Sequence, residues 1–267
     1  MKKFIFTLLM LMLSQQAFAT TYCTDASIGA CWLMNDTSGN LADSSGKANT
    51  LTSWYGTATY SATGQFGTAI TLNNSPFYNS SGTSIQVSLP ITLTVWLKPA
   101  SVTANQVIYS NAGMYGGSTG AQNGVWMFLN SSGQVQCGFG DGGGSGSSHQ
   151  QIATTTSSLT NSTYTHVACV IQGSSNIQIY FNGSSQSVSN AGSGGSISYS
   201  GGGELYTTIG RDAYGNYSST MTATYDELAQ FDRALSSTEI SNIMNNGLQS
   251  NESAGGTAVN SFFGDTF

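Results

Sequence analysis

The sequence predicts an all-β domain built from antiparallel sheets, and two observations carry this prediction. Short segments rich in β-branched and aromatic residues recur along the chain, each bounded by Gly, Asn or Ser turns. They are 93-LTVWLK-98, 124-GVWMFLN-130, 134-QVQCGF-139, 166-HVACVI-171 and 177-IQIYFN-182. The connections between them are too short for crossover helices, which favours antiparallel pairing. One β-sandwich of about 225 residues is within the normal size of a single domain.

A single segment has the signature of a helix, 236-SSTEISNIMNNG-247. Ser236 and Glu239 have the spacing of a capping box, and the apolar side chains that follow share one face. Gly247 can end the helix. We therefore expect one short helix near the end of the domain.

Composition excludes several classes of protein. Only 7% of the 267 residues are charged, against about 25% in a typical soluble domain. Gly, Ser, Thr and Asn take the place of the charged residues, and 39% of the chain is hydrophobic, which excludes a wholly disordered polar tract. The net charge is −6 and no basic cluster occurs, so no nucleic-acid partner is expected.

The first 19 residues resemble a cleaved signal peptide. Lys2 and Lys3 precede the apolar run 4-FIFTLLMLML-13, and Ala17-Phe18-Ala19 supplies small residues for cleavage. The alternative is a buried N-terminal helix. With cleavage, the mature chain has a net charge of −8 and contains no further apolar run that could be a transmembrane segment. We expect a secreted or cell-surface protein.

Four cysteines in an exported chain suggest two disulfides. Three pairings are possible. Cys23 and Cys31 are close in the sequence, while Cys137 and Cys169 lie on two predicted strands. We favour the pairs Cys23–Cys31 and Cys137–Cys169.

A series of motifs in the same order resembles the laminin G-like domains of the concanavalin A-like lectin/glucanase superfamily. The motifs are 29-GACWLMNDTSGNLADSSGKANT-50, 64-GQFGTAITLNN-74, 92-TLTVWLKPA-100, 164-YTHVACVI-171, 177-IQIYFNG-183, 207-TTIGRD-212 and 225-YDELAQFDRALSSTEI-240. Tyr164 stands where the family usually has Trp. The resemblance implies a two-sheet jelly-roll sandwich over residues 20–247. Such folds serve as glycan binders, adhesion modules and accessory domains, and some are glycosidases.

Paired carboxylates for glycoside hydrolysis are scarce. The mature chain has four glutamates, Glu204, Glu227, Glu239 and Glu252, and lacks the superfamily's glucanase signature of two glutamates around an aspartate. Asp226 and Glu227 are neighbours, so on a regular strand they face opposite sides and cannot act as a pair. We expect no catalytic residues and a protein that is not an enzyme.

Other catalytic motifs have simpler explanations. 116-GGSTG-120 matches the nucleophile motif around Ser118 but lies in a Gly/Ser loop without a strand–turn–helix. 138-GFGDGG-143 is not followed by a helix that could hold phosphate. His166 occupies a strand position, and His149 lies in a predicted loop. We expect neither histidine to be catalytic.

The resemblance implies a structural calcium site in the loop 41-LADSSGKAN-49. Hard cations prefer carboxylate, amide and carbonyl oxygens. The expected ligands are Asp43 and Asp226, and either the Asn49 side chain or a backbone carbonyl near Lys47 would complete the shell. The alternative is that Asp43 makes an Asx-turn with the backbone amides that follow it.

Exposed aromatic residues can stack on sugar rings, and short polar side chains can bind hydroxyls. Trp32, Trp96 and Trp126 lie on family core strands and are expected to be buried. The candidate ligand-binding residues lie in loop-like sequence instead; they are Trp54, Tyr55, Tyr115, Arg211, Asp212, Tyr214 and Tyr217. The alternative is a surface loop whose tyrosines pack over the end of a sheet.

These observations favour a secreted, non-catalytic binding or adhesion module that recognises extracellular or surface glycan. The alternative is a self-associating structural subunit of a surface fibre or matrix, and a weaker alternative is a glycoside hydrolase. Residues 248–267 are predicted to form a tail outside the core. Its polar connector ends in the aromatic segment 259-VNSFFGDTF-267, which could dock back on its own sheet or add to the edge strand of a neighbouring molecule.

Overall fold

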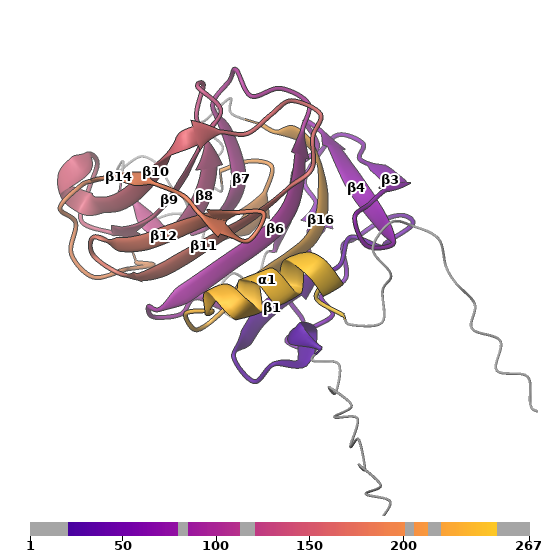
Figure 1. The fold of residues 1–267 in the computed structure, drawn as a ribbon, viewed down its shortest axis with the longest axis horizontal. Coiled ribbons are helices and arrows are strands. Elements are labelled where there is room, and N and C mark those ends of the chain that lie inside the picture. Colours follow the sequence, from indigo (N-terminus) through magenta and orange to yellow (C-terminus); the bar gives the residue numbers. More distant parts are fainter. Residues whose placement is uncertain (1–20, 80–84, 113–120, 201–205, 213–219, 250–267) are drawn as a thin grey trace, which may run out of the picture.

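The computed structural model describes residues 21–79, 85–112, 121–200, 206–212 and 220–249. Two antiparallel sheets pack face to face, and one helix crosses the outside of the sandwich (Figure 1). The prediction of a two-sheet jelly-roll sandwich with one C-terminal helix is confirmed. The predicted signal peptide and the residues after 249 lie outside the described residues.

The first sheet, sheet A, has β16 near its middle. In spatial order its strands are β13 (Ser184–Ser185), β12 (Asn176–Phe181), β11 (Thr165–Gly173), β6 (Ile91–Pro99), β16 (Thr222–Phe231), β4 (Thr68–Asn73) and β3 (Thr59–Thr63). β1 (Ile28–Trp32) also pairs with β16, beyond the stretch that pairs with β4.

The second sheet, sheet B, also has eight strands. In spatial order they are β14 (Val188–Ala191), β10 (Gln150–Ser158), β9 (Gln134–Asp141), β8 (Asn123–Leu129), β7 (Gln106–Asn111), β15 (Thr207–Ile209), β5 (Phe77–Asn79) and β2 (Thr52–Ser53). Short 3-10 turns, η1 (Tyr22–Thr24) and η3 (Ser147–His149), precede β1 and β10.

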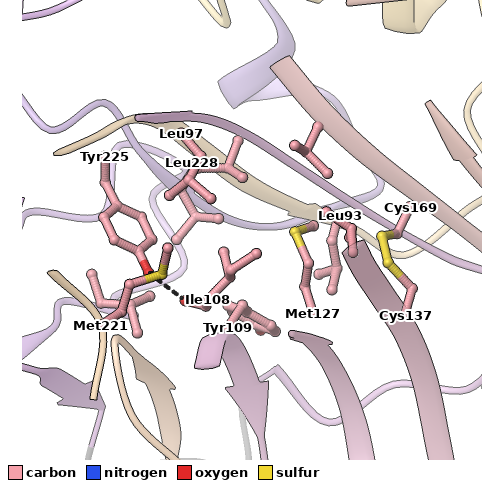
Figure 2. Close-up of a cluster of buried hydrophobic side chains, with 14 of the residues drawn as sticks. Leu93, Leu97, Ile108, Tyr109, Met127, Cys137, Cys169, Met221, Tyr225 and Leu228 are labelled. Carbon is pink, nitrogen blue, oxygen red and sulfur yellow. Dashed lines mark hydrogen bonds between the residues drawn. A yellow bond between two sulfur atoms is a disulfide. The ribbon is translucent and has the colours of Figure 1, made fainter. Parts of the chain in front are cut away.

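The core lies between the facing sides of the two sheets. Figure 2 shows Leu93 and Leu97 of sheet A above Ile108 and Met127 of sheet B. The buried hydroxyl of Tyr225 donates a hydrogen bond to the Ile108 carbonyl at 3.1 Å, which ties β16 to β7. Polar contacts inside the sandwich thus also cross from sheet to sheet.

Both predicted disulfides are present. Cys137–Cys169 joins β9 of sheet B to β11 of sheet A (Figure 2), and Cys23–Cys31 joins η1 to β1. Trp32 and Trp126 are fully buried and Trp96 is 8% exposed, as expected. These covalent links fix the sheets to one another and the N-terminal turn to its strand.

The helix α1 (Ser237–Asn246) packs on the outer face of sheet A, where Ile240 and Ile243 join a second apolar cluster. The predicted capping box is formed: the Ser236 hydroxyl accepts the Glu239 N–H, and the Glu239 carboxylate accepts the Ser236 N–H at 2.8 Å. Arg233 binds both Asp25 and Glu239 at 2.8 Å. The helix is therefore held by packing, capping and an ion-pair network.

The domain extends beyond the predicted boundary at Gly247. Leu248 is fully buried in the cluster under α1. Its N–H donates to the Glu227 carboxylate, and its carbonyl accepts the Tyr22 N–H at 2.8 Å. Leu248 is therefore part of the core, which corrects the expectation that the tail begins there.

Candidate functional site

Aromatic side chains gather on the outer face of sheet B, at the edge formed by β2, β5 and β15. Successive residues on a strand face opposite sides. Phe77 points into the core and is fully buried, so Tyr78 points outward. Tyr78 lies beside Thr52 of β2 and Thr208 of β15 in the strand register. This edge of the sheet presents a platform to solvent.

Three rings form the base of the platform. The ring centroids are 5.1 Å apart for Trp54 and Tyr78, 5.2 Å for Tyr78 and Tyr206, and 5.9 Å for Trp54 and Tyr206. Such tilted and edge-to-face arrangements are the favoured geometry of aromatic pairs. All three side chains are half-buried. The Trp54 N–H donates to the Pro76 carbonyl at 2.9 Å, which holds the loop after β2 against the sheet.

Arg211 brings a charged group to these rings. Its guanidinium carbon lies 4.9 Å from the Trp54 ring centroid and 5.2 Å from that of Tyr55, within the range of cation–π contacts. Tyr55 is 42% exposed, and it is the one large hydrophobic residue that is exposed among the described residues. We call Trp54, Tyr55, Tyr78 and Tyr206 the aromatic cluster.

Asp212 has a different place from the one expected. It is fully buried, and its carboxylate accepts a hydrogen bond from the Ser110 hydroxyl at 3.4 Å. Thr208 donates to the Arg211 carbonyl at 2.5 Å. Asp212 thus lies beneath the surface, where it supports the loop that carries Arg211. The prediction that Asp212 contacts the ligand directly is therefore replaced by a supporting role beneath the site.

The structure therefore brings together three of the residues predicted to bind ligand: Trp54, Tyr55 and Arg211. Tyr115, Tyr214 and Tyr217 lie outside the described residues. Sequence reasoning missed Tyr78 and Tyr206. Tyr78 follows another aromatic residue, Phe77, so the sequence shows no alternation there, and only the structure shows that Tyr78 faces outward.

The three residues expected to bind calcium do not form one set of ligands. The Asp43 carboxylate accepts the backbone N–H groups of Cys31, Ser45 and Asn49 at 2.8–3.0 Å. The bond to Ser45 is the Asx-turn of the alternative explanation. The Asn49 side chain turns inward, donating to the Gly29 carbonyl and accepting from Asn79.

Asp226 is engaged elsewhere, at the turn before β4. Its carboxylate accepts the N–H groups of Gln65 at 2.6 Å and Phe66 at 3.0 Å. No group of three or more His, Cys, Asp or Glu side chains that could hold a metal occurs among the described residues. Asp43 and Asn49 thus belong to one hydrogen-bonded loop, whereas Asp226 binds a different turn, and calcium binding stays a prediction of the resemblance.

Asp226 and Glu227 do not face opposite sides as expected. The pairing of β16 with β6 shifts between Asp226 and Ala229, and Glu227 has φ +52°. This β-bulge inserts one residue, so both carboxylates lie on the outer side of sheet A. Asp226 binds the turn at Phe66, and Glu227 binds the Leu248 N–H. Each carboxylate thus fixes a backbone segment to β16.

The two histidines are in unlike environments. His149, at the end of η3, places its Nδ1 3.0 Å from the carboxylate of Asp141, the last residue of β9, and both side chains are partly exposed. Burial opposes ionisation of Asp141, but hydrogen bonds from Gly195, Gly143 and His149 outweigh it and lower the pKa of that carboxyl. His166 is fully buried on β11.

The comparisons with known proteins agree with this architecture. Residues 64–241 match the family model of the concanavalin A-like lectin/glucanases superfamily. This match spans more than half of the chain, and the protein belongs to that superfamily. No curated protein matches the sequence.

Solved structures with the same fold include domain 4 of the arabinanase AbnA from Geobacillus stearothermophilus, determined with arabinotriose. It has 18% identity and a TM-score of 0.55, and the match covers 82% of this chain and 98% of that domain. The binding domain of Paraclostridial Mosquitocidal Protein 1 has 16% identity and a TM-score of 0.59, with 82% and 52% covered. Trypanosoma rangeli sialidase has 14% identity and a TM-score of 0.52, with 80% and 32% covered.

The chain thus spans about half of the mosquitocidal binding domain and a third of the sialidase. At these identities the likeness shows the fold. Within the part of the chain that the structure describes, no helix has the length and apolar character needed to cross a membrane.

Proposed function

We propose that the protein is a secreted, non-catalytic module that binds extracellular or surface glycan through the aromatic cluster and Arg211. The observation that carries this proposal is the exposed Tyr55 ring beside Trp54, with the Arg211 guanidinium against both rings. Aromatic faces bind the C–H faces of sugars, and a guanidinium donates hydrogen bonds to hydroxyl oxygens. The arabinotriose in the AbnA domain structure supports a saccharide ligand.

The absence of catalysis is part of the proposal. Support comes from the hydrogen bonds of the acidic residues, since Asp43, Asp226 and Glu227 each bind backbone N–H groups. A glycosidase needs two carboxyl groups about 5–10 Å apart across an open cleft. Hydrolysis of any glycan that the protein binds would contradict this part of the proposal.

A glycan array with the mature protein is the first test, followed by titration of the ligands it identifies. Tyr55→Ala should weaken binding about tenfold, equal to about 1.4 kcal/mol, without lowering the melting temperature, because the ring is exposed. Tyr60→Phe, on β3 of the other sheet, keeps the ring that packs against the core; it is the control and should bind normally. Equal binding by Tyr55→Ala and the wild type would refute the site.

Calcium dependence is tested in the same assay. Chelation should leave binding unchanged, because the side-chain oxygens of Asp43, Asp226 and Asn49 already accept hydrogen bonds within the protein. Loss of binding on chelation, restored by calcium, would return calcium to the proposal. Self-association as a fibre or matrix subunit stays a prediction of the low charge content, and concentration-dependent polymers in sedimentation would favour it.

A further inference from the structure

An open pocket lies on the opposite side of the sandwich from the aromatic cluster, on the outer face of sheet A beside the C-terminal end of α1. Its volume is about 640 Å³, within the range of small-molecule sites. The lining residues come from β6, α1 and the turns before β4, before β11 and after β12; they are Gln65, Phe66, Trp96, Ser162, Thr163, Tyr164, Asn182, Met244 and Asn245. We call this the helix-end pocket.

The lining combines aromatic rings with neutral hydrogen-bonding side chains. Trp96 and Tyr164 meet edge to face at 6.5 Å, and the Lys98 ammonium lies 5.4 Å from the centre of the Tyr164 ring. Three amides and two hydroxyls complete the walls, and none of the lining residues is charged. Amides offer a donor and an acceptor side by side, which suits neighbouring hydroxyl groups.

One amide is already oriented for a ligand. The Asn182 Oδ1 accepts the backbone N–H of His166 at 2.9 Å, which fixes the Asn182 side chain. The Asn182 Nδ2 makes no hydrogen bond to the described residues. Asn182 is exposed and follows β12 with φ +46°. A fixed donor at the pocket rim loses little side-chain entropy when it binds an acceptor.

Buried polar groups behind the wall also lack partners. Trp96 is 8% exposed and fully buried His166 packs against it, with ring centroids 5.3 Å apart. Among the described residues, neither the Trp96 indole N–H nor the two His166 ring nitrogens have a hydrogen-bond partner. These atoms are shielded from solvent, so they bind no ligand themselves, and the contacts of the pocket come from the Trp96 ring and the side chains around its rim.

We infer that the helix-end pocket binds a neutral saccharide and that the protein carries two saccharide sites on opposite faces. The uncharged lining and the net negative chain disfavour an anionic ligand, while the five hydrogen-bonding side chains disfavour a lipid. This site stands independently of the aromatic cluster. Two sites on opposite faces allow one molecule to bridge two glycan chains, with the gain in avidity that bivalence brings.

The four tryptophans of the chain provide separate reporters, because each gives one indole N–H signal in a nitrogen-15 NMR spectrum. Trp54 reports the aromatic cluster and Trp96 reports the helix-end pocket; Trp→Phe variants assign the signals. The probes are neutral gluco-, galacto-, manno- and arabino-oligosaccharides, with an oligogalacturonate for comparison. We expect at least one neutral probe to shift the Trp96 signal at millimolar concentration, and the galacturonate to leave it unchanged.

Asn245→Ala tests the pocket itself, because Asn245 is exposed on α1 and its removal spares the fold. The variant should lower the affinity measured from the Trp96 signal about tenfold and leave the affinity measured from the Trp54 signal unchanged. Asn246→Ala, its neighbour outside the pocket, is the matched control and should titrate like the wild type. Asn182→Asp, which keeps the acceptor for His166 and removes the donor, should weaken binding as well.

The outcomes separate the two sites. Shifts at Trp54 alone, or shifts at Trp96 that Asn245→Ala does not weaken, overturn the second site and leave the proposed function intact. Shifts at Trp96 alone support the second site and refute the role of the aromatic cluster. A Trp96 signal that moves with galacturonate and not with neutral sugars overturns the assignment of a neutral ligand.

Discussion

His166 should make the stability of the protein depend on pH, although no ionisable group of the described residues perturbs its ring. The imidazole is fully buried against Trp96, and neither ring nitrogen has a partner among the described residues. Burial penalises the charged form and lowers the pKa of His166 from 6.5 to about 3. The unfolded chain therefore takes up a proton near pH 6.5, whereas the folded protein stays neutral until about pH 3.

The direction and size of the effect follow from this difference. Between pH 6.5 and 3 the unfolded state binds more protons, so the free energy of unfolding falls as the pH falls. Each unit of pKa difference corresponds to 1.36 kcal/mol, which gives about 3 kcal/mol at pH 4.5 and a limit of about 5 kcal/mol below pH 3. Against a total stability of about 5–15 kcal/mol, this loss is large.

The variant His166→Phe keeps an aromatic ring of similar size and removes the titrating group. At pH 7.5 it should be at least as stable as the wild type, because two buried polar atoms without partners disappear. Urea unfolding at pH 7.5, 6 and 4.5 gives the free-energy difference between the two proteins at each pH. That difference should shift by about 3 kcal/mol in favour of the variant by pH 4.5.

The matched control is His149→Phe, which removes the only other histidine of the chain from its partly exposed loop. It should retain the dependence on pH that His166 confers. If the free energies of His166→Phe and the wild type run parallel from pH 7.5 to 4.5, the imidazole is solvated or paired in solution, and the reasoning from burial fails.

Three further substitutions test single structural links by urea unfolding. Asp43→Ala should lower the free energy of unfolding by about 3 kcal/mol, since its carboxylate holds three backbone N–H groups; a loss below about 1 kcal/mol would show that water replaces it. Cys137→Ser with Cys169→Ser should cost about 4 kcal/mol, because the bond closes a loop of 32-residue separation in the unfolded chain; an unchanged midpoint would contradict this. Ser236→Ala should cost about 1 kcal/mol through loss of the helix cap, and Ser237→Ala, one position later, should cost less.

The strands and the helix could be predicted because they depend on local patterns. Alternation in 177-IQIYFN-182 and capping at Ser236 act within a few residues, and the structure has both elements. The pairing Cys137–Cys169 also followed from the strand pattern. A sequence without an alignment carries these signals plainly, since the same side chains form the element and reveal it.

The site was harder to predict because it depends on contacts between distant segments. Tyr206 joins Trp54 only because β15 lies beside β5, and β5 lies beside β2. The bulge at Glu227 gives no local signal either, and it moved both carboxylates to one face. Regular alternation was a sound assumption that a single extra residue overturned.

The hydrogen bond between Tyr22 and Leu248 brings the entry and exit of the domain to one point. Because the two ends of the domain lie side by side, a chain that contains it enters and leaves the domain at nearly the same place. Such a unit can be inserted into a surface loop of a host protein, or duplicated in tandem, without forcing its surroundings apart. The closeness of its two ends therefore allows the domain to be inserted or duplicated independently of its ligand.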